Sequence, residues 1–307
     1  MQTYYNGAHS IIFCPVNTFS DANESTLPNY AHNFGGKHSW QDWGLVPLSR
    51  PYVAPPEPKT NTLEINGANG VVDLTEIPLG FPVYKNRTGT WEFAMAHDRI
   101  DLDPVPNHPG ILSDYAWDRQ LAVIMAYLHG RTVCVVLTDD PSYYYSGRVT
   151  VSQISADTMY TKITLSYDLY PYKRMVWTTL GNWEWNPFDF VYGQVTQNIF
   201  KNLRLDSDSA SSQLIVGGNP HGITPDIAGD EPVMPTIIFE SDDTTSCSMS
   251  INNVGYEAAG ARRFTIPDGT TTNRQIMIAC PYPDDICYMS FYSGHGNISI
   301  KFRPGRL

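Results

Sequence analysis

Apolar and polar side chains alternate along several short stretches of the chain, and this period of two is typical of β-strands with one buried face. Thr88–Ala96 is the clearest case, with Trp91, Phe93 and Met95 on one face. Two further stretches show the same alternation, through Leu63 and Ile65 in the first and through Ile163, Leu165 and Tyr167 in the second. The pattern predicts a chain built mainly from strands.

One stretch follows the period of a helix instead. Between about 113 and 129, apolar residues recur at four- and three-residue spacings, at Trp117, Leu121, Ile124 and Leu128. Ser113 or Asp114 can cap the start, and Gly130 is suited to the end. A buried strand, Thr132–Leu137, and a partner strand, Tyr143–Val151, are predicted to follow. We therefore expect one helix in a mainly β chain.

Glycine and proline divide the chain into turns and domains. Gly67, Gly70, Gly130 and Gly147 are the glycines whose positions we predict to be critical for turns. The first 33 residues are polar and predict an arm, with an extension packed on its own domain as the alternative. Pro171 marks a boundary between a domain at 34–173 and a second domain at 174–307. The last strand, 297–307, is a candidate to return towards the first domain.

The second domain is predicted to be all β, with turn residues at the spacing of a sandwich. The predicted strands are Val176–Thr179, Phe188–Val191, Gln213–Val216, Thr236–Glu240, Cys247–Asn252, Arg263–Ile266, Gln275–Ala279, Tyr288–Tyr292 and Ile298–Phe302. Ser293-Gly294 is a predicted turn between the last two strands, and Asp206–Ser212 is a predicted polar loop.

Composition limits the classes of function. Hydrophobic residues make up 42% of the 307 residues and charged ones only 17%, which favours surface hidden in an assembly. The net charge of −11 disfavours a DNA-reading protein, because an acidic surface repels phosphates. No apolar run is long enough to span a bilayer, and the N-terminal sequence lacks a signal-peptide pattern. The five cysteines are expected to be mostly buried free thiols.

The chain carries no motif for an active site. The acidic pairs Asp139/Asp140, Asp242/Asp243 and Asp284/Asp285 adjoin turn residues, where an Asp carboxylate bonds nearby backbone. Cys280, Cys287 and His295 lack a fourth ligand and the spacing of a zinc site. We therefore predict no catalytic residue, no bound cofactor and no metal ligand.

Aromatic residues offer two candidate surfaces. The run Tyr143-Tyr144-Tyr145 alternates faces in its strand, so a ring must point away from the core, and Arg148 is placed to pair with a carboxylate across a protomer interface. A solvated Arg148 is the alternative. Trp177, Trp183 and Trp185 form a candidate aromatic surface for stacking on sugars, with core and inter-domain packing as the alternative.

Several sequence words, in this order, resemble the distal tail proteins of long-tailed bacteriophages. They are HSWQDWGL (His38–Leu45), the proline stretch with Lys59, EINGANGVVDLTE (Glu64–Glu76), YKNRTGTWEF (Tyr84–Phe93), the helix ending in LHG (Leu128–Gly130), TDDPSYYYSGRV (Thr138–Val149), YPYKR (Tyr170–Arg174) and GNISIKFRPGRL (Gly296–Leu307). The resemblance covers roughly 34–173 and the C-terminal strand. The arm at 1–33 and the long loop Asp101–Gly110 depart from the family pattern.

The resemblance implies a ring-forming N-terminal β-domain with a helix, followed by a galectin-like β-sandwich. It implies a structural virion protein without enzymatic activity, arranged as a hexameric ring at the distal end of a phage tail, between the tail tube and the tip or baseplate. The expected partners are further copies of the chain, the tail tube protein, the tail-tip hub protein and receptor-binding or baseplate proteins. DNA would pass through the lumen without specific binding, and assembly would take place in the host cytoplasm. The alternative function is a carbohydrate-binding module for host attachment.

Overall fold

The computed structural model describes residues 9–19, 36–67, 69–77, 80–96, 112–156, 160–178, 201–207, 212–217, 229–254, 262–278 and 286–307. Over these residues the chain is mainly β with a single α-helix, as the sequence predicted. It separates into two compact units, Met1–Pro58 with Tyr84–Lys173 and Lys59–Val83 with Arg174–Leu307. The predicted domain limits stay a prediction, and the division places Lys59–Val83 with the second unit.

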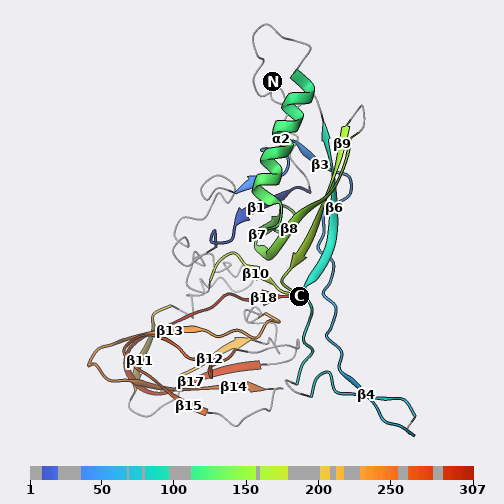
Figure 1. The fold of residues 1–307 in the computed structure, drawn as a ribbon. Helices are drawn as coiled ribbons and strands as arrows, with labels where there is room; N and C mark the ends of the chain where they lie inside the picture. Colours follow the sequence, from blue (N-terminus) through green and yellow to red (C-terminus); the bar gives the residue numbers. More distant parts are fainter. Residues whose placement is uncertain are drawn as a thin grey trace, which may run out of the picture. The chain divides into compact units, whose positions relative to one another are not determined.

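A curved antiparallel sheet forms the first unit (Figure 1). Its strands run in the order β2 (Lys37–His38), β1 (Ile11–Pro15), β7 (Arg131–Leu137), β8 (Tyr143–Ala156), β9 (Tyr160–Leu169), β6 (Arg87–Ala96) and β3 (Leu45–Pro47). The two edge strands have only two and three residues, which leaves little unpaired backbone for another chain to extend.

Helix α2 (Leu112–Leu128) packs along one face of this sheet (Figure 1). Leu121, Ile124 and Leu128, three residues of the predicted apolar stripe, are buried in the same core as Phe93 and Leu165. The apolar residues that alternate along the strands and those at helical spacing in α2 therefore pack into one hydrophobic core. The helix predicted at about 113–129 is observed one residue earlier at each end.

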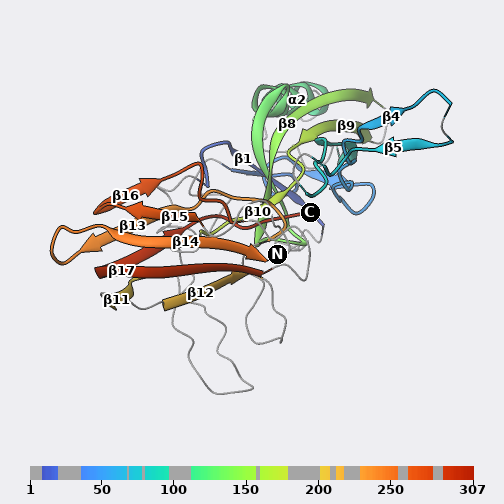
Figure 2. The same cartoon turned by 90° about the horizontal axis from the view of Figure 1, so that it is seen from below.

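A separate two-stranded hairpin is made by β4 (Thr62–Glu64) and β5 (Val71–Asp73). In its register, Thr62 is opposite Asp73, Leu63 is opposite Val72, and Glu64 is opposite Val71. Figure 2 shows the two strands side by side. Because side chains alternate faces along a strand, the Leu63–Val72 pair lies on one face of the ribbon and its two neighbouring pairs lie on the other.

The second unit is built around one long strand, β17 (Ile286–Lys301) (Figure 2). The first half of β17 pairs with β14 (Cys247–Val254) and β12 (Ser212–Gly217), and the second half pairs with β13 (Thr236–Ser241) and β11 (Leu203–Ser207). The remaining strands of this sheet are β15 (Arg262–Ile266) beside β14 and β16 (Gly269–Thr272) beside β13. Two short strands, β10 (Lys173–Met175) and β18 (Gly305–Arg306), pair with each other outside this sheet.

Four predicted strands of this unit are observed, within β12, β13, β14 and β15. The prediction of two strands separated by a turn at Ser293-Gly294 is wrong, because β17 continues through this position. Of the predicted strand Gln275–Ala279, the described residues, up to Ile278, contribute only an isolated bridge at Ile278, and Val176 to Thr178 are not in a strand. The predicted loop Asp206–Ser212 begins inside β11 and ends inside β12. Phe188–Val191 lies outside the described residues, and a galectin-like sandwich stays a prediction.

Candidate assembly surface

The β4–β5 hairpin exposes an unusual amount of apolar side chain. Five residues of the hairpin and its flank are between two fifths and three quarters exposed: Leu63 (51%), Ile65 (49%), Val71 (55%), Val72 (43%) and Ile77 (72%). Isolated surface-exposed hydrophobic residues are common, but here five lie within fifteen positions of one hairpin and its flank and form a local patch of exposed apolar side chains. Such a patch is typical of a surface that another protein covers.

One face of the hairpin carries most of this patch. Leu63 and Val72 are directly paired, and Ile65 continues the alternation on the same side. A lone two-stranded ribbon is marginally stable in water, so packing of this face against another surface would stabilise it. The sequence alternation predicted the strand but not its exposure, because alternation does not say whether the buried side belongs to the same chain.

The turns of the hairpin match their sequence signals. Gly67 and Gly70 have φ values of 89° and 81°, in the left-handed region that favours glycine. No other atoms lie within 4 Å of a side chain placed at either position. These glycines therefore shape the loop through backbone conformation alone.

The three tyrosines predicted at a protomer interface are largely used inside the first unit. Tyr144 is buried and stacks on Phe19, with 4.4 Å between ring centroids. Tyr145 is buried beneath the guanidinium of Arg87, and Tyr143 lies under the ammonium of Lys173, 4.6 Å from its ring centroid. Tyr144 and Tyr145 present little surface to a neighbour, so the interface assignment stays a prediction mainly for Tyr143.

Arg148 and the two predicted glycines near it lie at the end of α2 and in β8. The side chain of Arg148 is exposed and donates a hydrogen bond from Nη1 to the carbonyl of Gly130. Gly130 has a φ of 70° and donates its N–H to the carbonyl of Val149 at 2.9 Å. Gly147 lies within β8 rather than in a turn, where a Cβ atom would be 2.2 Å from the carbonyl oxygen of Asp168. Position 147 therefore requires glycine because β8 and β9 approach closely there.

Of the predicted aromatic surface, Trp177 is half-buried, and Trp183 and Trp185 lie outside the described residues. The second unit buries the thiols of Cys247 and Cys287, as the first does those of Cys14 and Cys134, and none of these four cysteines forms a disulfide. Cys280, Asp284 and Asp285 lie outside the described residues. Within the described part of the chain, no group of three or more His, Cys, Asp or Glu residues is placed to hold a metal ion.

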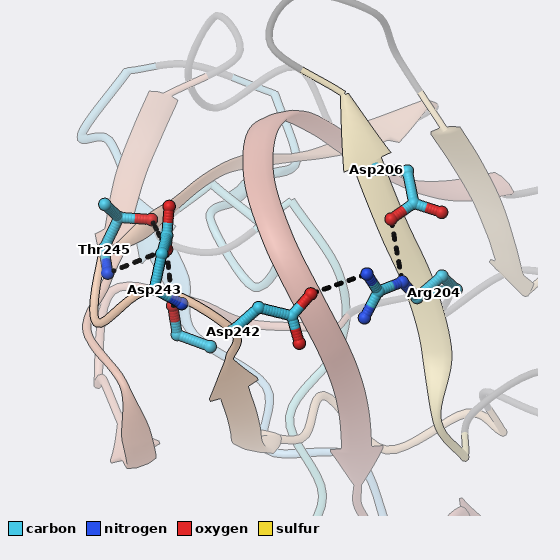
Figure 3. Close-up of polar contacts among 6 residues, drawn as sticks. Arg204, Asp206, Asp242, Asp243 and Thr245 are labelled. Carbon is cyan, nitrogen blue, oxygen red and sulfur yellow. Dashed lines mark hydrogen bonds and ion pairs between the residues drawn. The ribbon is translucent and has the colours of Figure 1, made fainter.

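The acidic pairs that the structure describes are bound by neighbouring cations and hydroxyls. Asp242 accepts a hydrogen bond from Arg204 at 2.6 Å, and Arg204 also donates to Asp206 at 2.8 Å (Figure 3). Asp243 turns away to its own loop, where hydrogen bonds from Thr245 and Ser241 hold its pKa below the ordinary value. Asp243 therefore shows the turn chemistry predicted for the pair, whereas Asp242 is bound by the cation of Arg204 in β11.

The pair in the first unit is also divided between different partners. Asp139 accepts hydrogen bonds from Arg50 at 2.7 Å and from His9 at 2.8 Å, whereas Asp140 is bound by Lys173 at 2.6 Å. Each carboxylate therefore ties separate segments of the unit together. The two do not face a shared site, as general acid–base chemistry would need.

No helix in the part of the chain that the structure describes is long and apolar enough to cross a membrane. No protein family model and no curated protein gives a significant match to the sequence. Two solved structures are similar in outline. The Dit protein of phage SPP1, a hub protein of the adsorption apparatus of phages infecting Gram-positive bacteria, is 14% identical, with a TM-score of 0.47 over 86% of this chain and 94% of that one.

The second structure is a chain of the phage P2 baseplate in its activated conformation with calcium. It is 10% identical, with a TM-score of 0.34 over 97% of both chains. TM-scores below 0.5 do not by themselves establish a shared fold.

Proposed function

We propose that this chain is a structural protein of a phage tail, which assembles with copies of itself into a hexameric ring at the distal end. The ring joins the tail tube to the tip or baseplate and its host-adhesion apparatus. It acts without enzymatic activity and without a cofactor. The observation that carries the proposal is the exposed apolar face of the β4–β5 hairpin.

The hairpin is suited to a ring because its exposed face need not pair with the same face of another copy. It can dock instead on a different surface of the next copy. When one surface of a protein docks on a different surface of the next copy, a rotation that closes produces a ring. The hairpin is formed by the sequence word EINGANGVVDLTE, one of those that resemble the distal tail family. Two other words form the β2–β3 turn and the β7–β8 hairpin of the first unit.

In this proposal the other partners are the tail tube protein, the tail-tip hub protein and baseplate or receptor-binding proteins. The second unit is a galectin-like sandwich, and DNA passes through the lumen without specific binding. The chain is a component of the virion, assembled in the host cytoplasm. A carbohydrate-binding function would rest on Trp183 and Trp185, which lie outside the described residues, and it stays a prediction.

The test is a mass measurement of the purified chain and of a hairpin variant. The native protein is expected to form particles of six times the 34.4 kDa of one chain. Leu63→Asp puts a charge on the apolar face, and it should weaken assembly by about tenfold or more, because burying one leucine side chain is worth roughly 1.5–3 kcal/mol.

Thr62→Lys is the control. It adds a charge one residue away, on the opposite face of the same strand, where Asp73 is directly opposite and can pair with it, so it should leave assembly near the native level. A native chain that stays monomeric at high concentration contradicts the proposed function. Equal assembly of the Leu63→Asp and Thr62→Lys variants contradicts the role of the hairpin face.

A further inference from the structure

The segment that leads into the β4–β5 hairpin has no strand partner at Tyr52 to Ala54, yet side chains satisfy its backbone groups. Trp91 donates from its indole nitrogen to the carbonyl of Tyr52 at 2.9 Å. The N–H of Ala54 donates to the hydroxyl of Tyr167 at 3.1 Å, and Arg87 Nη1 donates to the carbonyl of Ala54 at 3.1 Å. Three side chains therefore replace the hydrogen bonds that a neighbouring strand would supply.

These side chains come from one face of two adjacent strands. Arg87, Gly89 and Trp91 alternate along β6, and Tyr167 of β9 is directly opposite Gly89. The ring of Tyr167 stacks on Trp91, with 4.3 Å between centroids. A Cβ atom at Gly89 would be 2.3 Å from the Tyr167 hydroxyl oxygen. The glycine thus leaves the space through which Tyr167 reaches Ala54.

Arg87 adds a second connection. It is 4% exposed, and its Nε donates to the carbonyl of Pro171, just beyond β9, at 2.5 Å. Its Nη2 atom has no acceptor among the described residues, and the guanidinium lies over the ring of Tyr145 rather than beside a carboxylate. Burying a cation without a counter-charge costs free energy, so a gain in stability does not explain arginine here. The geometry of the guanidinium explains the arginine, because this one group reaches the carbonyls of Ala54 and Pro171, which belong to separate segments.

The segment held in this way becomes the root of the hairpin three residues later. The N–H of Lys85 donates to the carbonyl of Glu57 at 2.8 Å, the two side chains form an ion pair at 3.2 Å, and Pro58 bridges to Tyr84. The outgoing and returning chains therefore leave the sheet together. The outgoing chain is fixed at Tyr52 and Ala54, and the returning chain continues directly into β6.

We infer that Arg87, Trp91 and Tyr167 are positioning residues that fix the root of the β4–β5 hairpin, which is the segment from Tyr52 to Pro58. This inference rests on the proposed function. A hairpin with a mobile root would pay an ordering cost each time it docked on a neighbour, and a fixed root removes that cost before assembly. The three side chains act through the hairpin and do not themselves contact the neighbouring copy.

The test uses Tyr167→Phe in the full-length chain. Phenylalanine keeps the ring on Trp91 and removes only the hydroxyl that accepts from Ala54. We expect amide hydrogen exchange at Ala54 to become about fivefold faster, because one hydrogen bond contributes roughly 1 kcal/mol. Assembly should weaken by a similar factor.

Tyr127→Phe is the matched control, because Tyr127 donates its hydroxyl to the carbonyl of Phe13 at 3.1 Å elsewhere in the same unit. This variant should leave both Ala54 exchange and assembly at native levels. Unchanged exchange at Ala54 in Tyr167→Phe overturns the inference, as does assembly equal to that of Tyr127→Phe. A native chain that stays monomeric overturns the proposed function itself, whereas normal assembly of Tyr167→Phe in a native protein that does assemble overturns only the positioning role.

Discussion

At the scale of single residues, charged side chains tie distant segments of the first unit together. Asp139 receives Arg50 from the segment after β3 and His9 from the start of β1. Burial by itself would raise the pKa of Asp139, but hydrogen bonds and charges from Arg50 and His9 outweigh it and hold the pKa below 3.8. The stabilisation is therefore present above the pKa of the unfolded chain and is lost as the pH falls through the lower folded value.

Arg50→Ala is expected to raise the pKa of Asp139 towards 3.8, because it removes one of the two partners that favour the carboxylate. An NMR pH titration of the Asp139 carboxyl measures this directly. The stability at neutral pH should change by less than about 1 kcal/mol, since Arg50 is mostly exposed. Lys37→Ala, which removes a partner of Asp42, is the control and should leave Asp139 unchanged. An unshifted Asp139 in Arg50→Ala would contradict this assignment.

Residue roles were harder to predict than residue positions. The alternation of Tyr143, Tyr144 and Tyr145 correctly implied that both faces of β8 carry a ring, but not that Phe19 covers Tyr144. That contact joins residues more than a hundred positions apart, and no local pattern encodes it. At the hairpin, the sequence pattern predicted burial where the structure shows exposure. Leu63 and Ile65 alternate like buried residues, but they are half exposed in the single chain.

At the scale of elements, β17 shows that a glycine typical of turns can lie within a continuous strand. Gly294 and Gly296 have φ values of 137° and 148°, which residues with a side chain rarely adopt, while the pairing of the strand continues through them. A Cβ atom at Gly296 would be 2.2 Å from the carbonyl oxygen of Glu240 in β13. The two glycines therefore allow one strand to pair first with β14 and then with β13.

Gly296→Ala is expected to destabilise the second unit by about 2 kcal/mol or more, because both the backbone conformation and the contact with Glu240 oppose a side chain. Gly269→Ala is the control. Gly269 also has a positive φ, of 97°, but no other atoms lie within 4 Å of its added Cβ, so it should cost less. Chemical denaturation of the two variants compares them. Equal losses would show that close approach does not matter at Gly296.

The elements most open to prediction were those with a strong period. Helix α2 and strands β6, β7, β8 and β9 follow the spacing of their apolar residues closely. Short strands with polar residues were not predicted, and β11 is the clearest example, since Arg204 and Asp206 alternate with Leu203 and Leu205 over only five residues. Its pairing with β17 is decided by the tertiary fold rather than by propensity.

At the scale of the whole molecule, charge sets a condition on assembly. Each chain carries a net charge of −11, so copies that come together repel one another. The proposed contact is apolar, and its attraction does not depend on screening. The balance between the charge repulsion and the apolar attraction therefore varies with salt, because the screening length of the charges falls from roughly 30 Å at 0.01 M to roughly 8 Å at 0.15 M.

Assembly is accordingly expected to become stronger as NaCl rises from about 10 to about 150 mM, in measurements of sedimentation or particle mass over a dilution series. Leu63→Asp adds a further negative charge to the contact, so its weaker assembly should recover more steeply with salt than that of the native chain. A ring held by ion pairs would behave oppositely and dissociate as salt rises. Dissociation by salt would therefore contradict an apolar hairpin contact, and it would redirect attention to exposed charges such as Arg148. In the proposed ring, the same negative charge would repel the phosphates of DNA.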